Sequence, residues 1–373
     1  MTTAKELATA AGNGDLDAMR SMLVADSTLA TAWQPVMEAS LRGRPEALIL
    51  LLQHGADPNV KSRSSHHYRP LHRTVEHKKT IPKHEGHMRV VEILLDAGAD
   101  PLLPGSPWLI SAVALCATGD STEFLPVLLD RIPAALDIFH AALLGRTQRV
   151  QELLSHNPAL AASYDPDTRI WTDRRGWSAL LYCTRSCLGR NDKAKAKELA
   201  ATARCLLTHG ADPSGCIEHA IHSGNLEIME TLLEAGASVA DDDTLNHAAC
   251  DGQFEMLELL LKHGTRLDGT RGTEHHGGYT PLGCAVSCRS LQGVRWFLEQ
   301  GQDPNHIKSQ ANENCLHVAV HHGASNKMLQ LLLDFGTRLD QKDASGFTPL
   351  DRARTKKRTK AIPFLEAATA GTP

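Results

Sequence analysis

The histidines of this chain are its most numerous candidates for chemistry, with 20 among 373 residues. Imidazole groups bind zinc when neutral, and they exchange protons close to neutral pH. Several of them occur close together in the sequence: His66/His67/His72/His77, His84/His87, His275/His276 and His321/His322. Zinc sites need three or four ligands, and their sequences usually show closely spaced pairs such as CxxC. Neither these clusters nor the cysteines show that pattern, so we expect no metal and no other cofactor.

Acid–base catalysis or small-molecule binding is a second use for such side chains. The candidate groups are His140, Tyr182, His219 and His247, with nearby charged residues that could overhang them: Asp165, Asp167, Asp173, Arg174 and Arg175. Side chains from neighbouring packed helices would lie about 8–10 Å apart, which is too far for shared metal ligation without further ligands. No G-x-S-x-G, P-loop or G-x-G-x-x-G motif occurs in a strand–helix context. An enzyme, or a protein that binds a metal or small molecule, is therefore the alternative hypothesis.

The elements that carry these residues repeat along the chain. The phrase "LLQHGADPN" at 51–59 returns as "LLDAGADPL" from Leu94, "LLTHGADPS" from Leu206 and "FLEQGQDPN" from Phe297. Its final glycines lie at 55, 98, 210, 236, 264, 301 and 336, so the last four intervals are 26, 28, 37 and 35 residues. Segments such as "GQFEMLELLLKHG" (252–264) have apolar residues at i, i+3, i+4 and i+7. That period predicts an amphipathic helix.

A second phrase precedes several of these helices: "RPLHRTV" (69–75), "YTPLGCAV" (279–286), "CLHVAV" (315–320) and "FTPLDRA" (347–353). Proline suits the first turn of a helix, and glycine ends a helix in the left-handed conformation. Together the phrases resemble the ankyrin repeat, whose period is about 33 residues and whose motif is T-P-L-H-x-A. The resemblance implies an all-α ankyrin-repeat solenoid of helix-turn-helix units with β-hairpin finger loops.

The resemblance extends over residues 1–373 as a single array of about eleven repeats. Residues 1–30 would form the N-terminal cap repeat, and residues 346–373 the C-terminal cap repeat. Each repeat is expected to bury an apolar residue and a small residue three positions later. These anchor pairs are Leu7/Ala10, Val36/Ala39, Leu71/Thr74, Leu109/Ala112, Ile138/Ala141, Leu180/Cys183, Ile217/Ala220, Leu245/Ala248, Leu282/Ala285, Leu316/Ala319 and Leu350/Ala353.

The resemblance also predicts which side chains face a concave groove and its fingers. The residue two positions after each anchor should point away from the buried face, and it reads Thr9, Glu38, Arg73, Ser111, His140, Tyr182, His219, His247, Cys284, Val318 and Arg352. Aromatic residues and arginines in the fingers are typical of interfaces. We therefore predict a protein partner, centred on repeats five to nine, that contacts a set of exposed residues. They are Tyr68, Arg73, His140, Trp171, Arg174, Arg175, Trp177, Tyr182, His219, His247 and Tyr279.

Lysine-rich insertions at 78–85 and 187–197 separate the paired helices of the third and sixth repeats. They predict solvated, extended turns, and the alternative is a docking edge for an acidic partner. The last segment, "TKKRTKAIPFLEAATAGTP" (355–373), carries cations at its start. A solvated cap is the leading interpretation of this run, and a nuclear-localisation or anion-binding patch is its rival.

Bulk composition limits the classes of partner. The net charge is −4, with 42% apolar and 22% charged residues, so we expect no nucleic-acid partner and no membrane-surface binding. No apolar stretch approaches the roughly 18–20 residues that span a bilayer, and the start of the chain lacks the pattern of a secretory signal. The nine scattered cysteines predict free thiols in a reducing cytoplasm. We expect a cytoplasmic monomer that binds a protein.

Overall fold

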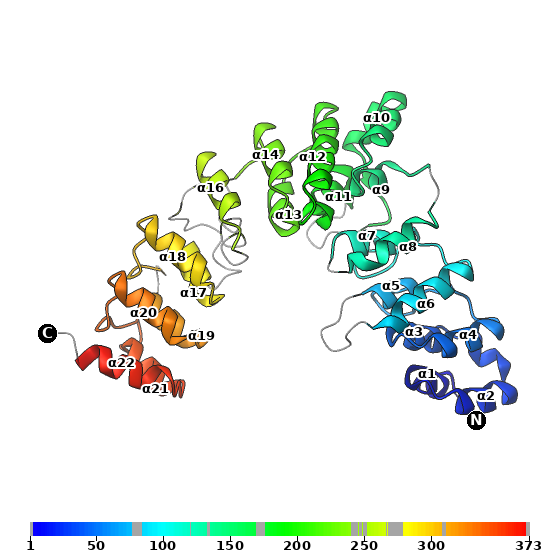
Figure 1. The fold of residues 1–373 in the computed structure, drawn as a ribbon, viewed down its shortest axis with the longest axis horizontal. Coiled ribbons are helices and arrows are strands. Elements are labelled where there is room, and N and C mark those ends of the chain that lie inside the picture. Colours follow the sequence, from blue (N-terminus) through cyan, green and yellow to red (C-terminus); the bar gives the residue numbers. More distant parts are fainter. Residues whose placement is uncertain are drawn as a thin grey trace. The chain divides into compact units, whose positions relative to one another are not determined.

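The computed structural model describes residues 3–76, 84–119, 121–132, 135–168, 176–239, 245, 248, 252–265, 267, 279–307 and 311–370. Within these ranges the regular structure is almost entirely helical (Figure 1). One short antiparallel pair joins β1 (Tyr164–Asp165) to β2 (Trp177–Ser178), with Asp165 opposite Trp177. The predicted all-α class is confirmed. The chain divides into two compact units, Met1–Asp212 and Pro213–Pro373.

In the first unit, one helix of each repeat packs on the corresponding helix of the next repeat. These first helices are α1 (Ala4–Asn13), α3 (Trp33–Leu41), α5 (Pro70–Val75), α7 (Ala112–Ala117), α9 (Ile138–Leu143) and α11 (Ala179–Arg185). The second helices are α2 (Leu16–Ala25), α4 (Pro45–Gln53), α6 (Glu85–Asp96), α8 (Leu125–Leu129), α10 (Thr147–His156) and α12 (Lys193–Thr208). Short 3-10 turns accompany them as η1 (Ser27–Thr31), η2 (Thr122–Phe124), η3 (Pro158–Ala162) and η4 (Cys187–Gly189).

The second unit repeats this arrangement. Its first helices are α13 (Cys216–Ser223), α17 (Pro281–Ser287), α19 (Cys315–His322) and α21 (Pro349–Thr355). Its second helices are α14 (Leu226–Glu234), α16 (Phe254–Lys262), α18 (Leu291–Glu299), α20 (Asn326–Asp334) and α22 (Ala361–Ala370). Helix α19 packs between α17 and α21, so three successive repeats share one continuous apolar core.

The predicted start and stop signals act as expected. Thr280 and Thr348 cap α17 and α21, and each is followed by a proline in the first turn. Every glycine that ends the recurring phrase has a positive φ, between 81° and 92°. This left-handed conformation is costly for residues with a Cβ atom, which explains why glycine recurs there.

The asparagine of "DPN" joins one repeat to the next. The side chain of Asn59 donates to the Gly98 carbonyl and accepts from the Asp100 amide, both at 2.8 Å. Asn305 makes the equivalent pair of bonds to the repeat that follows it. Its side chain donates to the Gly336 carbonyl at 3.1 Å and accepts from the Arg338 amide at 2.8 Å. The phrase therefore holds neighbouring repeats in register as well as ending a helix.

The buried histidines extend this register. The Nε2 atom of His72 donates to the carbonyl of Ile110 at 2.9 Å, and His317 Nε2 donates to that of Phe347 at 2.9 Å. Both acceptors belong to the finger of the following repeat. These histidines are therefore structural links between repeats.

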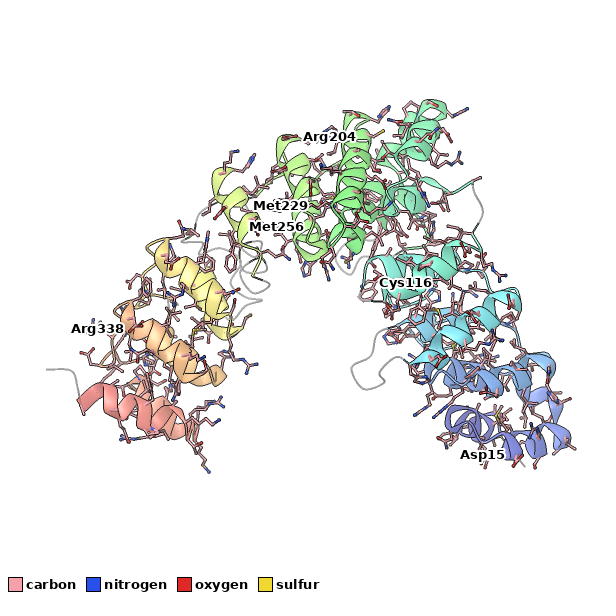
Figure 2. The ribbon with its side chains drawn as sticks, in the orientation of Figure 1. Asp15, Cys116, Arg204, Met229, Met256 and Arg338 are labelled. Carbon is pink, nitrogen blue, oxygen red and sulfur yellow. The ribbon has the colours of Figure 1, made fainter. Side chains whose placement is uncertain are left out.

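Two expectations about the repeats need correction. Helix α7 begins after Ser111, so its buried pair is Val113 and Cys116, of which Figure 2 labels Cys116. The predicted anchor Leu109 is half-exposed with φ +56°. The insertion at 187–197 is largely helical, because η4 and the first turn of α12 occupy it. Most of the other insertion, at 78–85, lies outside the described residues.

The cysteines differ in part from the expectation of free thiols. Cys288 is disulfide-bonded. The other cysteines within the described ranges form no disulfide, and most of them are buried in the helix cores. They act there as small apolar residues.

Candidate functional site

The first unit contains a groove of about 590 Å³ that crosses its first three repeats. Helices α1, α3 and α5 form its floor, and the finger at 62–68 forms one side. Its lining includes Lys5, Trp33, Arg42, His66, Tyr68 and Arg73. We refer to this surface as the α1–α5 groove. A volume of this size is typical of pockets that bind ligands or side chains.

The finger beside the groove is closed by its own hydrogen bonds. The Ser62 amide donates to the Tyr68 carbonyl at 2.8 Å, and the Ser62 and Ser64 hydroxyls lie 2.9 Å apart. Arg69 then fixes the base of the finger by donating to the carbonyls of Asn59 at 2.5 Å and Pro104 at 2.9 Å. These contacts place the Tyr68 ring over the groove before any ligand arrives.

Tyr68 is held at the groove by two charged residues. Its hydroxyl donates to Glu76, whose other carboxylate oxygen lies 3.1 Å from Arg73 Nη1. The Arg73 guanidinium also lies 4.8 Å from the centre of the Tyr68 ring. Burial and the neighbouring carboxylate raise the pKa of Tyr68, so its phenol remains neutral and donating. The ring is therefore preorganised, and binding would cost little further side-chain entropy.

The groove lining has more positive than negative charge. Arg42 pairs with Glu38 at 3.3 Å, and both side chains are solvent-accessible. Lys5 is exposed and forms no ion pair with any residue that the structure describes. Lys61 and Arg63 add two exposed cations to the adjoining finger. Partly exposed Trp33 supplies a large apolar surface among these charges. The groove thus offers an aromatic contact surface with a positive rim.

Residues 217–308 match the family model "Ankyrin repeats (3 copies)". This part of the chain therefore consists of ankyrin repeats. The chain is also similar to a solved structure titled "Crystal structure of human ASB11 ankyrin repeat domain", with 23% sequence identity and a TM-score of 0.49. That similarity covers 64% of this chain and 99% of the other. Ankyrin repeats generally act as protein-interaction modules, which supports a protein-binding repeat scaffold. The number of repeats and their extent over the whole chain stay predictions.

The structure buries three of the side chains expected to be exposed. The exposed fractions are 2% for Trp177, 1% for Tyr182 and 7% for His140. The Trp177 ring packs edge-on against Tyr182 with 5.2 Å between ring centres, and the Arg185 guanidinium covers it at 4.6 Å. The expectation of exposure was wrong for these residues. The β1–β2 finger folds onto its own helix α11 and covers Trp177 and Tyr182, whereas Ser111 and Asp137 enclose His140.

The Tyr182 hydroxyl is also used inside the protein. It donates to Asp165 Oδ2 at 2.7 Å, across the base of the β1–β2 finger. Burial raises the pKa of Tyr182, and the charge of Asp165 raises it further. This phenol therefore fastens the finger to α11 and is not a proton donor for a substrate.

His140 lies in a chain of polar groups that resembles a catalytic triad. Its Nδ1 lies 2.8 Å from Asp137 Oδ2, and its Nε2 lies 2.9 Å from Ser111 Oγ. Burial alone would raise the pKa of Asp137, but hydrogen bonds and the charge of His140 outweigh it and lower the pKa. Ser111 Oγ is 3.0 Å from the Ala114 amide that it caps, and the residue is only 3% exposed. The chain of bonds links repeats four and five and gives no support to a serine nucleophile.

The remaining predicted site residues fall into two groups. Tyr68 and Arg73 lie in the α1–α5 groove, as described above. In the second unit, His219 and Tyr279 are partly exposed, and the Tyr279 ring lies 6.3 Å from that of His322. Burial raises the pKa of Tyr279. The remaining predicted contacts, Trp171, Arg174, Arg175 and His247, lie outside the described residues.

Sequence reasoning did not select Lys5, Arg42 and His66 for this groove. The sequence did contain one signal for this groove, which is the position of Trp33. It lies at the start of a first helix, as Tyr68 and Trp177 lie near the starts of theirs. Arg42 and Lys5 come from a helix end and a first turn, where single exposed cations are common. Only their convergence on one cavity distinguishes them.

Within the described ranges, no group of three or more His, Cys, Asp or Glu side chains could hold a metal ion. None of the helices in that part of the chain is both long and apolar enough to span a membrane.

Proposed function

We propose that this ankyrin-repeat protein binds a partner protein through the α1–α5 groove, and that the bound segment combines acidic and apolar residues. The observation that carries the proposal is the lining itself. Trp33 and Tyr68 present apolar rings beside Lys5, Arg42 and Arg73, with Glu38 as the only lining carboxylate among the described residues. Aromatic and arginine side chains contribute most of the binding energy in protein interfaces.

Electrostatics and preorganisation support the same occupant. A cationic rim accelerates association with an acidic segment and favours it over a basic one. The Tyr68 ring is already fixed by Glu76 and Arg73. A bound apolar side chain could therefore pack against Tyr68 and Trp33 without reordering the finger.

Fluorescence anisotropy with a short labelled peptide of alternating glutamate and leucine tests this proposal. Trp33→Ala and Lys5→Gln together should weaken binding by about tenfold or more, which corresponds to about 1.4 kcal/mol or more. The matched control is Trp296→Ala with Lys327→Gln, which removes the same residue types from second helices of the other unit. A peptide of alternating lysine and leucine should bind far more weakly than the acidic one.

Two outcomes of these binding measurements would contradict the proposal. Equal affinity for the acidic and basic peptides would show that the charged rim does not select the occupant. Equal loss in the groove and control variants would show that the groove is not the contact surface.

A further inference from the structure

The second unit contains a pocket of about 850 Å³ along the turns that join its paired helices. Three successive turns contribute to it, following α17, α19 and α21. Its lining includes Arg289, Gly323, Ser325, Lys357, Arg358 and Lys360. We refer to it as the basic pocket. It includes part of the cationic run at 355–360. The sequence allows two interpretations of this run: a solvated cap, or a nuclear-localisation or anion-binding patch.

The cations of the basic pocket have no carboxylate partner among the described residues. In the part of the chain that the structure describes, no acidic side chain lines it. Arg289, Lys357, Arg358 and Lys360 form no ion pair within the part of the chain that the structure describes. By contrast, Arg354, directly before this run, pairs with Glu366 at 2.7 Å. Arg289, Lys357 and Lys360 are exposed, and no carboxylate among the described residues neutralises them.

Arg358 is fixed at the inner side of this pocket. Its Nε donates to the Val320 carbonyl at 3.0 Å, and its Nη2 donates to the His321 carbonyl. These carbonyls belong to the last turn of α19, whose partial negative charge suits a guanidinium. Gly323 lies against the same group, since a Cβ atom there would come within 3.1 Å of Nη1. The charge is thus held in place without being cancelled by a carboxylate.

Two helix ends add to the positive potential. Helix α20 begins after its cap Ser325, and α22 begins at Ala361, and both residues line the pocket. The amino end of a helix carries a partial positive charge and offers amide N–H groups to an anion. These ends strengthen a site that the cationic side chains already define.

Neighbouring histidines respond to the same excess of positive charge. Burial lowers the pKa of His321, and Lys356 lowers it further. Burial also lowers the pKa of His322, followed by the effects of His321, Arg289 and Arg358. Uncompensated positive charge of this kind destabilises a protein unless an anion offsets it.

We propose that the basic pocket binds the phosphate group of a phosphorylated serine or threonine in a partner protein. A phosphomonoester carries a charge of about −1.5 to −2 at pH 7 and three strong acceptor oxygens, which matches several cations and two helix ends better than a single carboxylate does. The volume exceeds that of one phosphate group and leaves room for the side chain that carries it. The inference uses the protein-binding class of ankyrin repeats, but it does not depend on the α1–α5 groove.

The probe for this proposal is a short fluorescein-labelled peptide of alanine and glycine with one central phosphoserine. Its unphosphorylated form is the reference. Wild-type protein should bind the phosphopeptide at least tenfold more tightly, and millimolar inorganic phosphate should compete. Lys357→Gln with Lys360→Gln should weaken phosphopeptide binding about tenfold, and Lys357→Arg with Lys360→Arg should preserve it. Arg358 is left unchanged, because it links two repeats.

The chain offers a matched control for the loss of charge. Lys356→Gln with Lys342→Gln removes two exposed cations of the same unit that do not line the pocket. Phosphopeptide affinity should stay within about twofold in this control. It should also survive Trp33→Ala with Lys5→Gln, so failure of the α1–α5 groove proposal can be told apart from failure of this one.

Three outcomes would overturn the proposal. The unphosphorylated peptide could bind equally well, so that phosphate contributes nothing. The control variant could lose as much affinity as the pocket variant, which would indicate a diffuse cationic surface. A short single-stranded oligonucleotide could bind more tightly than the phosphopeptide and compete with it, which would assign the cations to nucleic acid.

Discussion

His72 should make the stability of the first unit fall as the pH drops from about 6.5 to about 4. The side chain is 1% exposed, and its Nε2 donates to the Ile110 carbonyl at 2.9 Å. No hydrogen-bond partner reaches its Nδ1 among the described residues. Burial lowers the pKa of His72 to about 4, although the bond to Ile110 acts in the opposite direction. A proton on this ring therefore favours the unfolded chain.

The sign and size of the effect follow from the two pKa values. The unfolded chain binds a proton near pH 6.5 and the folded chain only near pH 4, so the stabilising contribution is complete above pH 6.5. This contribution is lost progressively as the pH falls from about 6.5 to about 4, the pKa of His72 in the folded chain. At 1.36 kcal/mol for each pH unit, the full interval corresponds to about 3 kcal/mol. About 2 kcal/mol of this should be lost by pH 5.

Hydrogen–deuterium exchange of the α5 and α7 amides, corrected for intrinsic rates, measures the effect locally. Between pH 7 and pH 5, wild-type protection should fall about thirtyfold more than that of His72→Gln, since about 2 kcal/mol is a factor of about 30. Glutamine can still donate to Ile110 but does not titrate. His156→Gln, at an exposed site in α10, should behave as wild type. Identical pH dependence in wild type and His72→Gln would refute the reasoning.

Three further substitutions test the contacts between repeats. Gly105→Ala should lower the melting temperature, because its Cβ would lie 2.6 Å from the His72 ring; the loss should shrink in a His72→Ala background, and a constant loss would contradict the predicted clash. Asn59→Ala should cost about 2 kcal/mol in urea unfolding by removing two bonds to the next repeat; an unchanged midpoint would show that these bonds do not stabilise the array. Ser111→Ala should cost about 1–2 kcal/mol by removing the α7 cap and the partner of His140; Ser111→Thr keeps the hydroxyl, and equal destabilisation of both variants would rule the cap out as the cause.

The recurring phrases predicted the helices well because each encodes a local backbone requirement. Glycine after "LLxx" satisfies a positive φ, and Thr-Pro satisfies the first turn of a helix. Such requirements depend on neighbours in the sequence and can be read without the fold. The register failed where the local signal was ambiguous, since Ser111 caps α7 and shifts the expected anchor at Leu109 by one turn.

The exposure of the predicted binding residues depended on contacts that the sequence does not encode locally. His140 occupies a position expected to face the groove, yet Ser111 from the preceding repeat and Asp137 enclose it. The α1–α5 groove likewise forms from side chains about 70 residues apart in the sequence, Lys5 and Arg73. Only the packing of successive repeats brings them together.

Finger structure explains why equivalent aromatic residues have opposite exposure. Trp33 follows the 3-10 turn η1, no β-strand pairs before it, and its ring remains partly exposed. Trp177 belongs to the paired strands β1 and β2, where its amide donates to Thr168 Oγ1 at 2.7 Å and its ring is enclosed by Tyr182 and Arg185. The position before a first helix therefore supplies an aromatic side chain, and the preceding finger decides whether that side chain stabilises the repeat or faces a partner. The proposal for the α1–α5 groove therefore rests on Trp33 and Tyr68, which line it, and not on Trp177, which is buried.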